Sequence, residues 1–323
     1  MKSIQIERFG GPEVLVIKDM DIGKPGPKEV LIKNKSIGLN FIDIYHRTGL
    51  YPIPLPSGIG LEASGVIEEI GSEVKLFKVG DRVTHASMPI GAYSEKQIMP
   101  EEKLVSVPDG VSDEVASCIT LKGITAEYLL HRAYRLKKGD KVLYHAAAGA
   151  LGQILCPWAN ALGAEVIGTV GSKAKEEIAK KNGCHHVINY SEKDFVKEVE
   201  KTFGKNSLDV VYDGVGSKTF KGSIETLKIR GMMVAFGNAS GYVETLDIKK
   251  DINAKGLFFT RPSIAHYTVK REELVESAKK VFDAVLTKKF KIEISKRYPL
   301  KNAAQAHKDL ENRLLTGPAV IIP

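Results

Sequence analysis

A strand-like segment followed by small residues stands near the middle of the chain. Residues 141–152 read Lys-Val-Leu-Tyr-His-Ala-Ala-Ala-Gly-Ala-Leu-Gly, with Ala147, Gly149 and Gly152 at the spacing of a glycine-rich turn that opens a helix. Small residues let the backbone turn tightly and let a pyrophosphate approach the amides of a helix N-terminus. A ligand-free strand–helix turn is the alternative. Because the turn begins a strand–helix–strand repeat, we expect it to bind a dinucleotide, with Gly149 and Gly152 in the turn.

The end of the next strand bears on which dinucleotide is bound. It reads Thr-Val-Gly-Ser-Lys-Ala-Lys over residues 169–175, without a carboxylate. An NAD site carries an acidic residue about 20 positions after the turn, which bonds the ribose hydroxyls. Here a hydroxyl and lysines at a helix start favour an anion instead, such as a 2′-phosphate. We therefore predict NADPH rather than NADH, the alternative being that Lys173 and Lys175 only face solvent.

The elements that position these residues alternate between strands and helices. Apolar strands are expected at 142–146, 165–170, 186–189, 208–213, 231–236 and 256–260, and helices at 151–162 and 172–182. This alternation is typical of a doubly wound parallel Rossmann sheet with six strands. Pro157 falls inside the first helix, where we expect a kink or an early break because proline removes a backbone hydrogen bond.

The rest of the chain predicts a second, β-rich domain. Short strand-like runs at 29–33 and 65–70 are separated by Gly/Pro turns, a pattern that indicates a bent sheet or partial barrel. After about residue 263, helical stretches at 271–288 and 302–313 and a strand at 319–322 have no place in a six-stranded sheet. We therefore expect residues 1–122 and 265–323 to form one domain, with residues 123–264 inserted as the Rossmann domain.

Composition excludes several classes of protein. The net charge is +8, but the lysines are scattered, so we expect a solvated basic surface and no nucleic-acid partner. No apolar run approaches the ~20 residues that span a bilayer, and we expect no membrane association and no secretory signal. Three widely spaced cysteines form no disulfide framework, which favours the cytoplasm.

Several segments together resemble the zinc-free, zeta-crystallin-like quinone oxidoreductases of the medium-chain dehydrogenase/reductase superfamily. The resemblance runs nearly from end to end. It rests on the residues at 38–45 (Gly-Leu-Asn-Phe-Ile-Asp-Ile-Tyr), 49–52, 80–83, 145–149, 168–171, 236–238 and 310–313. It implies an α/β fold in which the Rossmann domain is inserted in a GroES-like catalytic domain. It also implies an enzyme, an NADPH:quinone oxidoreductase, without zinc or flavin.

The superfamily also contains zinc alcohol dehydrogenases, so the metal ligands can be compared position by position. Asn40 and Lys122 stand where those enzymes carry cysteines, and Leu61 stands where they carry histidine. Zinc requires Cys, His or carboxylate ligands in a near-tetrahedral array. We therefore predict no metal site. The adjacent His185 and His186, at a strand start, are interpreted as surface or packing residues.

The resemblance also implies site residues. At the pyrophosphate it places Gly149, Ala150 and Leu151. Under the nicotinamide it places Asn40, Phe41, Asp43 and Tyr45, with Tyr128 nearby. On the adenosine 2′-phosphate side it places Gly171, Ser172, Lys175, Tyr190 and Arg313, where Arg313 is expected to be helical. At the far rim of the cofactor it places Gly214, Phe236, Gly237, Asn238, Phe259 and Arg261.

A quinone is a good acceptor, so positioning beside nicotinamide can suffice without a metal. Our candidates to line the substrate side of an interdomain cleft are Asn40, Tyr45, Tyr51, Lys122 and Thr125. The transfer is a hydride or two separate electrons. The alternatives are an enoyl or alkenal C=C reductase on the same scaffold, with Tyr51 as proton donor, and a non-enzymatic NADPH- or RNA-binding protein. The apolar run at 256–260 predicts a homodimer joined through Rossmann edge strands.

Overall fold

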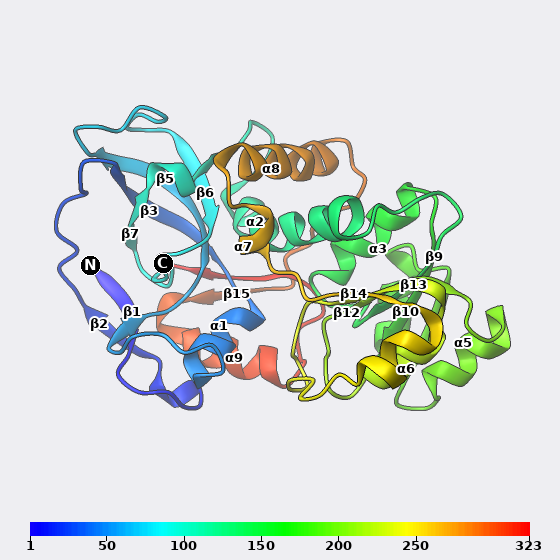
Figure 1. Cartoon of the computed structure of the whole chain (residues 1–323). Helices are drawn as coiled ribbons and strands as arrows, with labels where there is room; N and C mark the ends of the chain where they lie inside the picture. The colour runs from blue at the N-terminus through cyan, green and yellow to red at the C-terminus, as the bar shows by residue number, and fades with distance from the viewer. The chain divides into compact units, whose positions relative to one another are not determined.

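The computed structural model describes residues 1–323, which form two compact units. Unit 1 contains Met1–Ile124, Thr268–Leu286 and Ile292–Pro323, and unit 2 contains Thr125–Tyr267 and Thr287–Lys291. The sequence contains no pattern from which one would predict that residues 287–291 belong to unit 2. The α/β fold class expected from the sequence is confirmed, with a parallel sheet in the inserted unit (Figure 1).

Unit 1 is built on two sheets that are antiparallel except for one strand pair. The larger has seven strands in the order β15-β16-β3-β5-β6-β8, with β7 also paired to β3. Their bounds are β3 (Glu29–Gly38), β5 (Glu62–Ile70), β6 (Arg82–Ala86), β7 (Lys96–Pro100), β8 (Val105–Ser106), β15 (Lys296–Pro299) and β16 (Ala319–Ile322). The smaller sheet contains β1 (Lys2–Ile6), β2 (Val16–Asp19) and β4 (Ser57–Gly58). Apolar residues that alternate along these strands, such as Ile4, Ile37 and Ile321, form the core between them.

Four longer helices complete unit 1: α1 (Phe41–Thr48), α2 (Asp113–Tyr128), α8 (Arg271–Leu286) and α9 (Ala303–Glu311). We had not predicted α1 or α2. The last residues of α2 belong to unit 2, so this helix carries the chain from one unit to the other. A Cβ at Gly123 would lie only 2.4 Å from the Val281 side chain, so glycine lets α2 and α8 approach closely.

Unit 2 is a six-stranded parallel sheet in the order β11-β10-β9-β12-β13-β14, the doubly wound arrangement that binds dinucleotides. The strands are β9 (Lys141–His145), β10 (Glu165–Val170), β11 (His186–Asn189), β12 (Leu208–Asp213), β13 (Leu227–Ala235) and β14 (Phe258–Thr260). The helices are α3 (Gly152–Ala161), α4 (Lys173–Lys181), α5 (Phe195–Phe203), α6 (Phe220–Thr226) and α7 (Ile264–Tyr267). Leu143, Ile167 and Val211 fill the core on one face of the sheet.

One local expectation needs correction. Helix α3 does not break at Pro157 but continues to Ala161, because Trp158 and Ala159 on the same segment are buried and packing holds the turn. The expected domain boundary after residue 122 stays a prediction; the two compact units divide after Ile124, which also lies inside α2.

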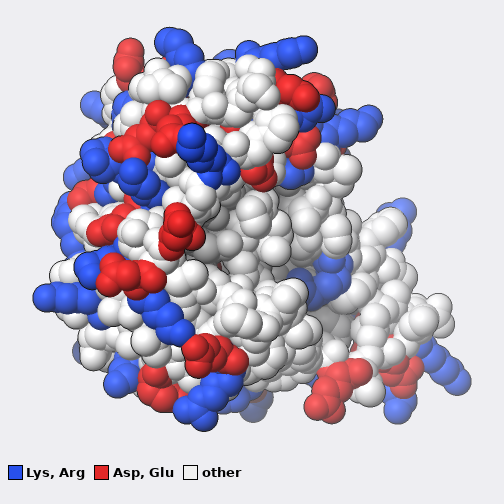
Figure 2. Space-filling view, turned by 90° about the vertical axis from the view of Figure 1, so that its left-hand side faces the viewer, with Lys and Arg blue, Asp and Glu red and all other residues white.

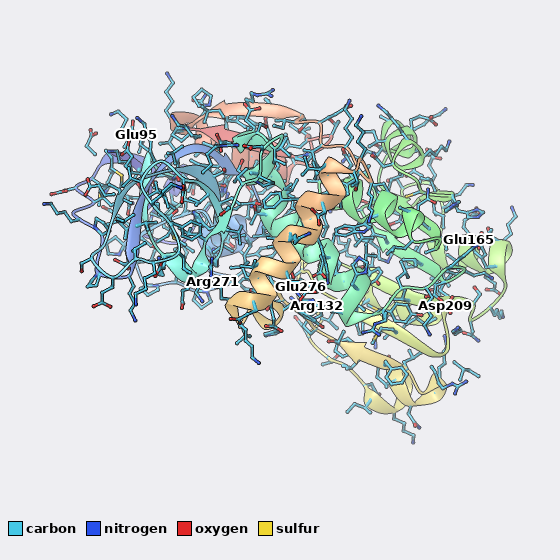
Figure 3. All side chains as sticks on the ribbon, turned by 90° about the horizontal axis from the view of Figure 1, so that it is seen from above. Glu95, Arg132, Glu165, Asp209, Arg271 and Glu276 are labelled. Carbon is cyan, nitrogen blue, oxygen red and sulfur yellow. The ribbon has the colours of Figure 1, made fainter.

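The surface carries charges of both signs. Basic and acidic side chains are intermingled over the face that Figure 2 presents. In unit 2, Glu165 and Asp209 lie at the amino ends of their strands, where Asp209 accepts a hydrogen bond from the Lys141 amide (2.7 Å) (Figure 3). No helix has both the length and the apolar character that crossing a membrane requires.

Candidate functional site

The turn after β9 has the shape that its small residues predict. Ala146 adopts a left-handed backbone with φ of 61°, and the chain then folds back into α3. A Cβ at Gly152 would lie 2.3 Å from the Ala147 carbonyl oxygen, so this glycine allows the helix to pack against the strand end. Gly149, Ala150 and Leu151 are half-buried at the N-terminus of the ten-residue helix. A tight, partly open turn of this kind fits a pyrophosphate.

The segment after β10 lies beside this turn because β9 and β10 are paired in parallel, with His145 opposite Thr169. Ser172 is the N-cap residue of α4, and its hydroxyl makes no capping hydrogen bond. A Cβ at Gly171 would lie 2.5 Å from the Tyr190 hydroxyl, so only glycine lets the tyrosine ring lie against this loop. Lys175 is half-buried in the first turn of α4. Gly171, Ser172, Lys175 and Tyr190 thus come together at one strand end.

Two further loops, one after β12 and one after β13, lie against each other. The aromatic ring of Phe236 covers Gly214, where a Cβ would approach the ring to 2.8 Å, and a Cβ at Gly237 would lie 2.4 Å from the Gly214 carbonyl oxygen. Asn238 is buried beside them. Phe259, on the edge strand β14, and Arg261 are more exposed. The side of the site formed by these two loops thus lies at the carboxyl edge of the sheet and contains Gly214, Phe236, Gly237 and Asn238.

In unit 1, Asn40 and Lys122 meet at a residue that our sequence analysis missed. The Glu62 carboxylate, fully buried, accepts hydrogen bonds from the Asn40 amide nitrogen (2.8 Å), the Leu121 backbone amide (2.7 Å) and the Lys122 ammonium (3.4 Å). Burial raises the pKa of Glu62, while Lys122 and the hydrogen bonds oppose that rise. Glu62 and Lys122 are 60 positions apart in the chain, so no local pattern joins them.

Asn40 and Lys122 in this cluster stand at two of the three positions that were compared with zinc ligands in the sequence. Leu61, at the third compared position, is buried and supplies no ligand atom. The cation in the cluster is the Lys122 ammonium, which pairs with the Glu62 carboxylate. No group of three or more His, Cys, Asp or Glu side chains is arranged to hold a metal ion.

The Asp43 side chain is enclosed within unit 1, and its expected place under the nicotinamide stays a prediction. It is fully buried at the third position of α1, where one carboxylate oxygen accepts hydrogen bonds from the Asn40 backbone amide (3.0 Å) and the Tyr93 hydroxyl (2.9 Å). Burial raises the pKa of Asp43 to about 7, against the lowering effect of both hydrogen bonds. Asp43 therefore fixes the start of α1 and with it Asn40.

The aromatic wall expected from the sequence lies on and after α1. The rings of Tyr45 and Tyr51 contact each other edge to face at 5.1 Å, and Phe41 lies 6.4 Å from Tyr45. Phe41 is exposed, and both tyrosines are half-buried. Phenol oxygens and ring faces thus lie on α1 and on the segment just after it, and Asn40 is the N-cap of that helix.

Thr125 and Tyr128 lie at the start of unit 2 and are both buried. The Tyr128 ring stacks on Tyr267 at 4.5 Å, and Arg132 places its guanidinium over the other ring at 5.0 Å (Figure 3). The expectation that Tyr128 lies near the nicotinamide stays a prediction, and Tyr267 covers one face of its ring. Arg313 is not helical, which corrects our expectation: α9 ends at Glu311, and Arg313 has a left-handed φ of 58°.

A second buried network in unit 1 involves residues that sequence reasoning missed. The Tyr93 hydroxyl lies 3.1 Å from His307 Nε2, and Arg47 lies 3.2 Å from His307 Nδ1. Arg47 also binds the Glu311 carboxylate through two nitrogens. The partners are up to 264 positions apart in the chain, so no local pattern could have joined them.

A GroES-like unit with an inserted six-stranded Rossmann sheet defines a medium-chain dehydrogenase/reductase. Sequence profiles agree: the alcohol dehydrogenase GroES-like domain matches residues 26–109, and the zinc-binding dehydrogenase family matches residues 150–285. The chain is 45% identical to the quinone oxidoreductase of Pseudomonas aeruginosa, over 100% of this chain and 99% of that one. It is 44% identical to a 2-haloacrylate reductase from a Burkholderia species, over 98% of each.

Among solved structures, Escherichia coli quinone oxidoreductase complexed with NADPH superposes with a TM-score of 0.97 at 43% identity, and all of both chains is covered. The chain belongs to the quinone oxidoreductase family. The family resemblance seen in the sequence is thereby confirmed, as is the oxidoreductase class.

Proposed function

We propose that this protein is an NADPH-dependent quinone reductase that works without a metal. The observation that carries the proposal is the Asn40–Glu62–Lys122 cluster, in which an amide and an ammonium stand where zinc enzymes of the superfamily carry cysteines. The glycine-rich turn after β9 and the acid-free loop after β10 support NADPH as the cofactor. The names of the relatives, and the NADPH in the E. coli structure, support the same choice.

Bound NADPH supplies a hydride or two electrons, and the chain needs only to position the acceptor and supply protons. A quinone needs little Lewis-acid help because its reduced oxygens take protons from water or weak donors. Phe41, Tyr45 and Tyr51 offer an aromatic wall for a planar ring, with phenol donors beside it. Asn40 is held in place from two sides, by Glu62 at its amide and by Asp43 at its backbone.

The second candidate is reduction of an activated C=C bond, which the 44%-identical 2-haloacrylate reductase favours. In that reaction a side chain protonates the carbon next to the carbonyl, and the half-buried Tyr51 is our candidate donor. A panel of quinones, enones, haloacrylates and enoyl thioesters, followed through NADPH oxidation, separates the two. We expect turnover with quinones; turnover confined to C=C substrates contradicts the proposal.

The absence of zinc from the mechanism has its own test. Purified protein should contain well under one zinc per subunit and retain quinone reduction in chelator, because Asn40, Leu61 and Lys122 offer no tetrahedral ligand set. Stoichiometric zinc, with activity lost when it is removed, contradicts this part of the proposal.

We further propose a two-fold dimer through the edge strand β14 and a location in the cytoplasm. Phe258 on that strand is 59% exposed, and the nearby β13 exposes Ile229 to 67%. An apolar edge of this kind favours pairing with a second copy. Light scattering at micromolar concentration should give a dimer, and Phe258→Glu should give a monomer. For the location, the three buried, unpaired cysteines are typical of a reducing compartment.

A further inference from the structure

A buried polar network joins the carboxyl ends of three neighbouring strands in unit 2. His145, the last residue of β9, lies with Nδ1 2.9 Å from the Thr169 hydroxyl on β10 and with Nε2 2.9 Å from the Ser223 hydroxyl on α6. Ser223 in turn donates to the carboxylate of Asp213, the last residue of β12 (2.9 Å). All four side chains are buried, and the edge of the Phe195 ring covers the imidazole.

A single assignment of donors and acceptors satisfies every polar group in the network. Asp213 accepts from the Val215 and Gly216 amides on one oxygen and from the Thr219 and Ser223 hydroxyls on the other. The Ser223 oxygen then accepts from His145 Nε2–H, and His145 Nδ1 accepts from the Thr169 hydroxyl. Burial lowers the pKa of His145, so the imidazole is neutral, as this pattern requires.

Each strand end in the network leads directly into a loop of the dinucleotide site. His145 precedes the left-handed Ala146 and the glycine-rich turn, and Thr169 comes just before the Gly171–Ser172 loop. Asp213 precedes Gly214 and holds the following amides. The backbone adds one link, since the Ala147 amide donates to the Thr169 carbonyl (3.0 Å). One imidazole therefore connects the loops that we assign to the pyrophosphate, the 2′-phosphate and the far rim.

We propose that His145 is a positioning residue of the dinucleotide site, which sets the spacing of these three loops through Thr169, Ser223 and Asp213. The proposal rests on the proposed function, because it assigns a role toward the same cofactor. None of the four residues is predicted to touch the cofactor. The pyrophosphate and far-rim loops recognise parts that NADPH and NADH share, and the third loop faces the 2′-phosphate, so losing the network weakens both cofactors, NADPH at least as much as NADH.

The test uses substitutions that keep shape while removing hydrogen bonds. Thr169→Val removes the hydroxyl, Thr169→Ser retains it, and His145→Phe keeps an aromatic ring against Phe195. Thr226→Val is the matched control, because Thr226 is a buried hydroxyl on the same helix as Ser223 that bonds only the Ser223 carbonyl (2.8 Å). Dissociation constants for NADPH and NADH are measured by titration calorimetry, with melting temperature and the KM for the quinone followed in parallel.

We expect Thr169→Val and His145→Phe to raise both dissociation constants by about five- to thirtyfold, the effect of one or two lost buried hydrogen bonds. The NADPH constant should rise at least as much as the NADH constant, the quinone KM should remain near that of the parent, and Thr169→Ser should restore binding. Thr226→Val should lower the melting temperature with less than about a twofold change in binding.

Two results overturn the inference: parental affinity in Thr169→Val and His145→Phe, or an equal loss of affinity in the Thr226→Val control. Failure of the proposed function looks different. In that case the parent protein itself binds neither NADPH nor NADH, before any substitution is made.

Discussion

The two units bury polar side chains in different ways. Beside the candidate site, unit 1 buries the ion pair of Lys122 with Glu62. At its cofactor loops, unit 2 instead buries a chain of hydroxyls and one neutral imidazole that ends on the Asp213 carboxylate, although elsewhere it too has a buried carboxylate, Glu127, paired with Arg132. The first arrangement is held by opposite charges, and the second by hydrogen bonds between loops.

The difference has consequences that can be separated by experiment. A buried ion pair gains its attraction against a large desolvation cost, so removing one partner leaves an uncompensated charge. A satisfied hydrogen-bond chain contributes less per group, and its loss shifts geometry more than charge. Substitutions in unit 1 should therefore change stability and its pH dependence, and those around the cofactor loops of unit 2 should change cofactor affinity.

The largest effect is expected from Lys122→Met, which leaves the Glu62 carboxylate buried without its cation. The free energy of unfolding at pH 8 should fall by about 3–5 kcal/mol, measured by urea denaturation. The double variant Glu62→Gln/Lys122→Met removes both charges and should recover most of that loss. If the double variant is no more stable than Lys122→Met alone, the loss of stability does not come from the unpaired Glu62 charge.

A change in pH dependence is expected from Asp43→Asn. The folded pKa of Asp43 is about 7, above its ordinary 3.8, because the carboxyl is buried. A raised carboxyl pKa contributes stability that is present below about pH 4 and is lost as the pH rises through 7. The stability of the parent relative to Asp43→Asn should therefore fall by about 2–4 kcal/mol between pH 4 and 7.

The pH dependence of stability that Asp43 contributes can be distinguished from that of the buried histidines. Burial lowers the pKa of His85 to about 4 and that of His307 to about 3, so their contribution is present above pH 6.5 and is lost on acidification. Both proteins share that loss, which cancels in the difference. A difference that does not change with pH would mean that Asp43 titrates normally.

In unit 2, Lys175→Ala should separate the two cofactors. A hydrogen bond to a charged group contributes ~1.5–3 kcal/mol, so loss of a contact with the 2′-phosphate should raise the NADPH dissociation constant about ten- to a hundredfold. NADH affinity should barely change, and salt should weaken NADPH more than NADH in the parent. Lys180→Ala is the control, since Lys180 lies on the same helix and pairs with Glu177 at the surface. Equal weakening of both cofactors would refute the role of this loop.

The smallest effect is expected at the left-handed Ala146. Glycine tolerates this backbone at no steric cost, whereas alanine is disfavoured there by ~1–2 kcal/mol, offset partly by the greater freedom of unfolded glycine. Ala146→Gly should therefore raise the free energy of unfolding by about 0.5 kcal/mol. Ala148→Gly, outside the left-handed region, should lower it instead. A loss of stability in both variants would show that Ala146 is not strained.

The strands of unit 2 could be predicted from sequence because each is a local apolar run. The predictions for 165–170, 186–189 and 208–213 coincide with β10, β11 and β12. Helix α1 was missed because residues 41–48 mix aromatic, charged and β-branched side chains. Both ends of this helix nevertheless carry capping signals: Asp43 bonds back to Asn40, and Gly49 follows the helix with a φ of 80°.

The residues of the candidate site also fall into two groups, those that local sequence patterns predict and those that they do not. Loop residues such as Gly149 and Ser172 could be located because a turn and a helix start are local events. The partners Glu62, Tyr93 and His307 could not, because Glu62 contacts Asn40, Tyr93 contacts Asp43 and His307 contacts Tyr93 only across long stretches of chain. The helical state expected for Arg313 was wrong for a related reason, since a left-handed φ at this residue has no signal in the neighbouring sequence.

The order in which the strands are made differs between the units. All six strands of the unit 2 sheet lie within residues 141–260, so this sheet can assemble while the rest of the chain is still being synthesised. In unit 1, strand β3 near the start pairs with β16, where Ile321 lies opposite Ile37. Such distant pairing is slow to close and leaves β3 with an unpaired edge until the final residues arrive. A ribosome-bound chain should therefore carry a folded unit 2 beside a unit 1 that still needs protection from aggregation.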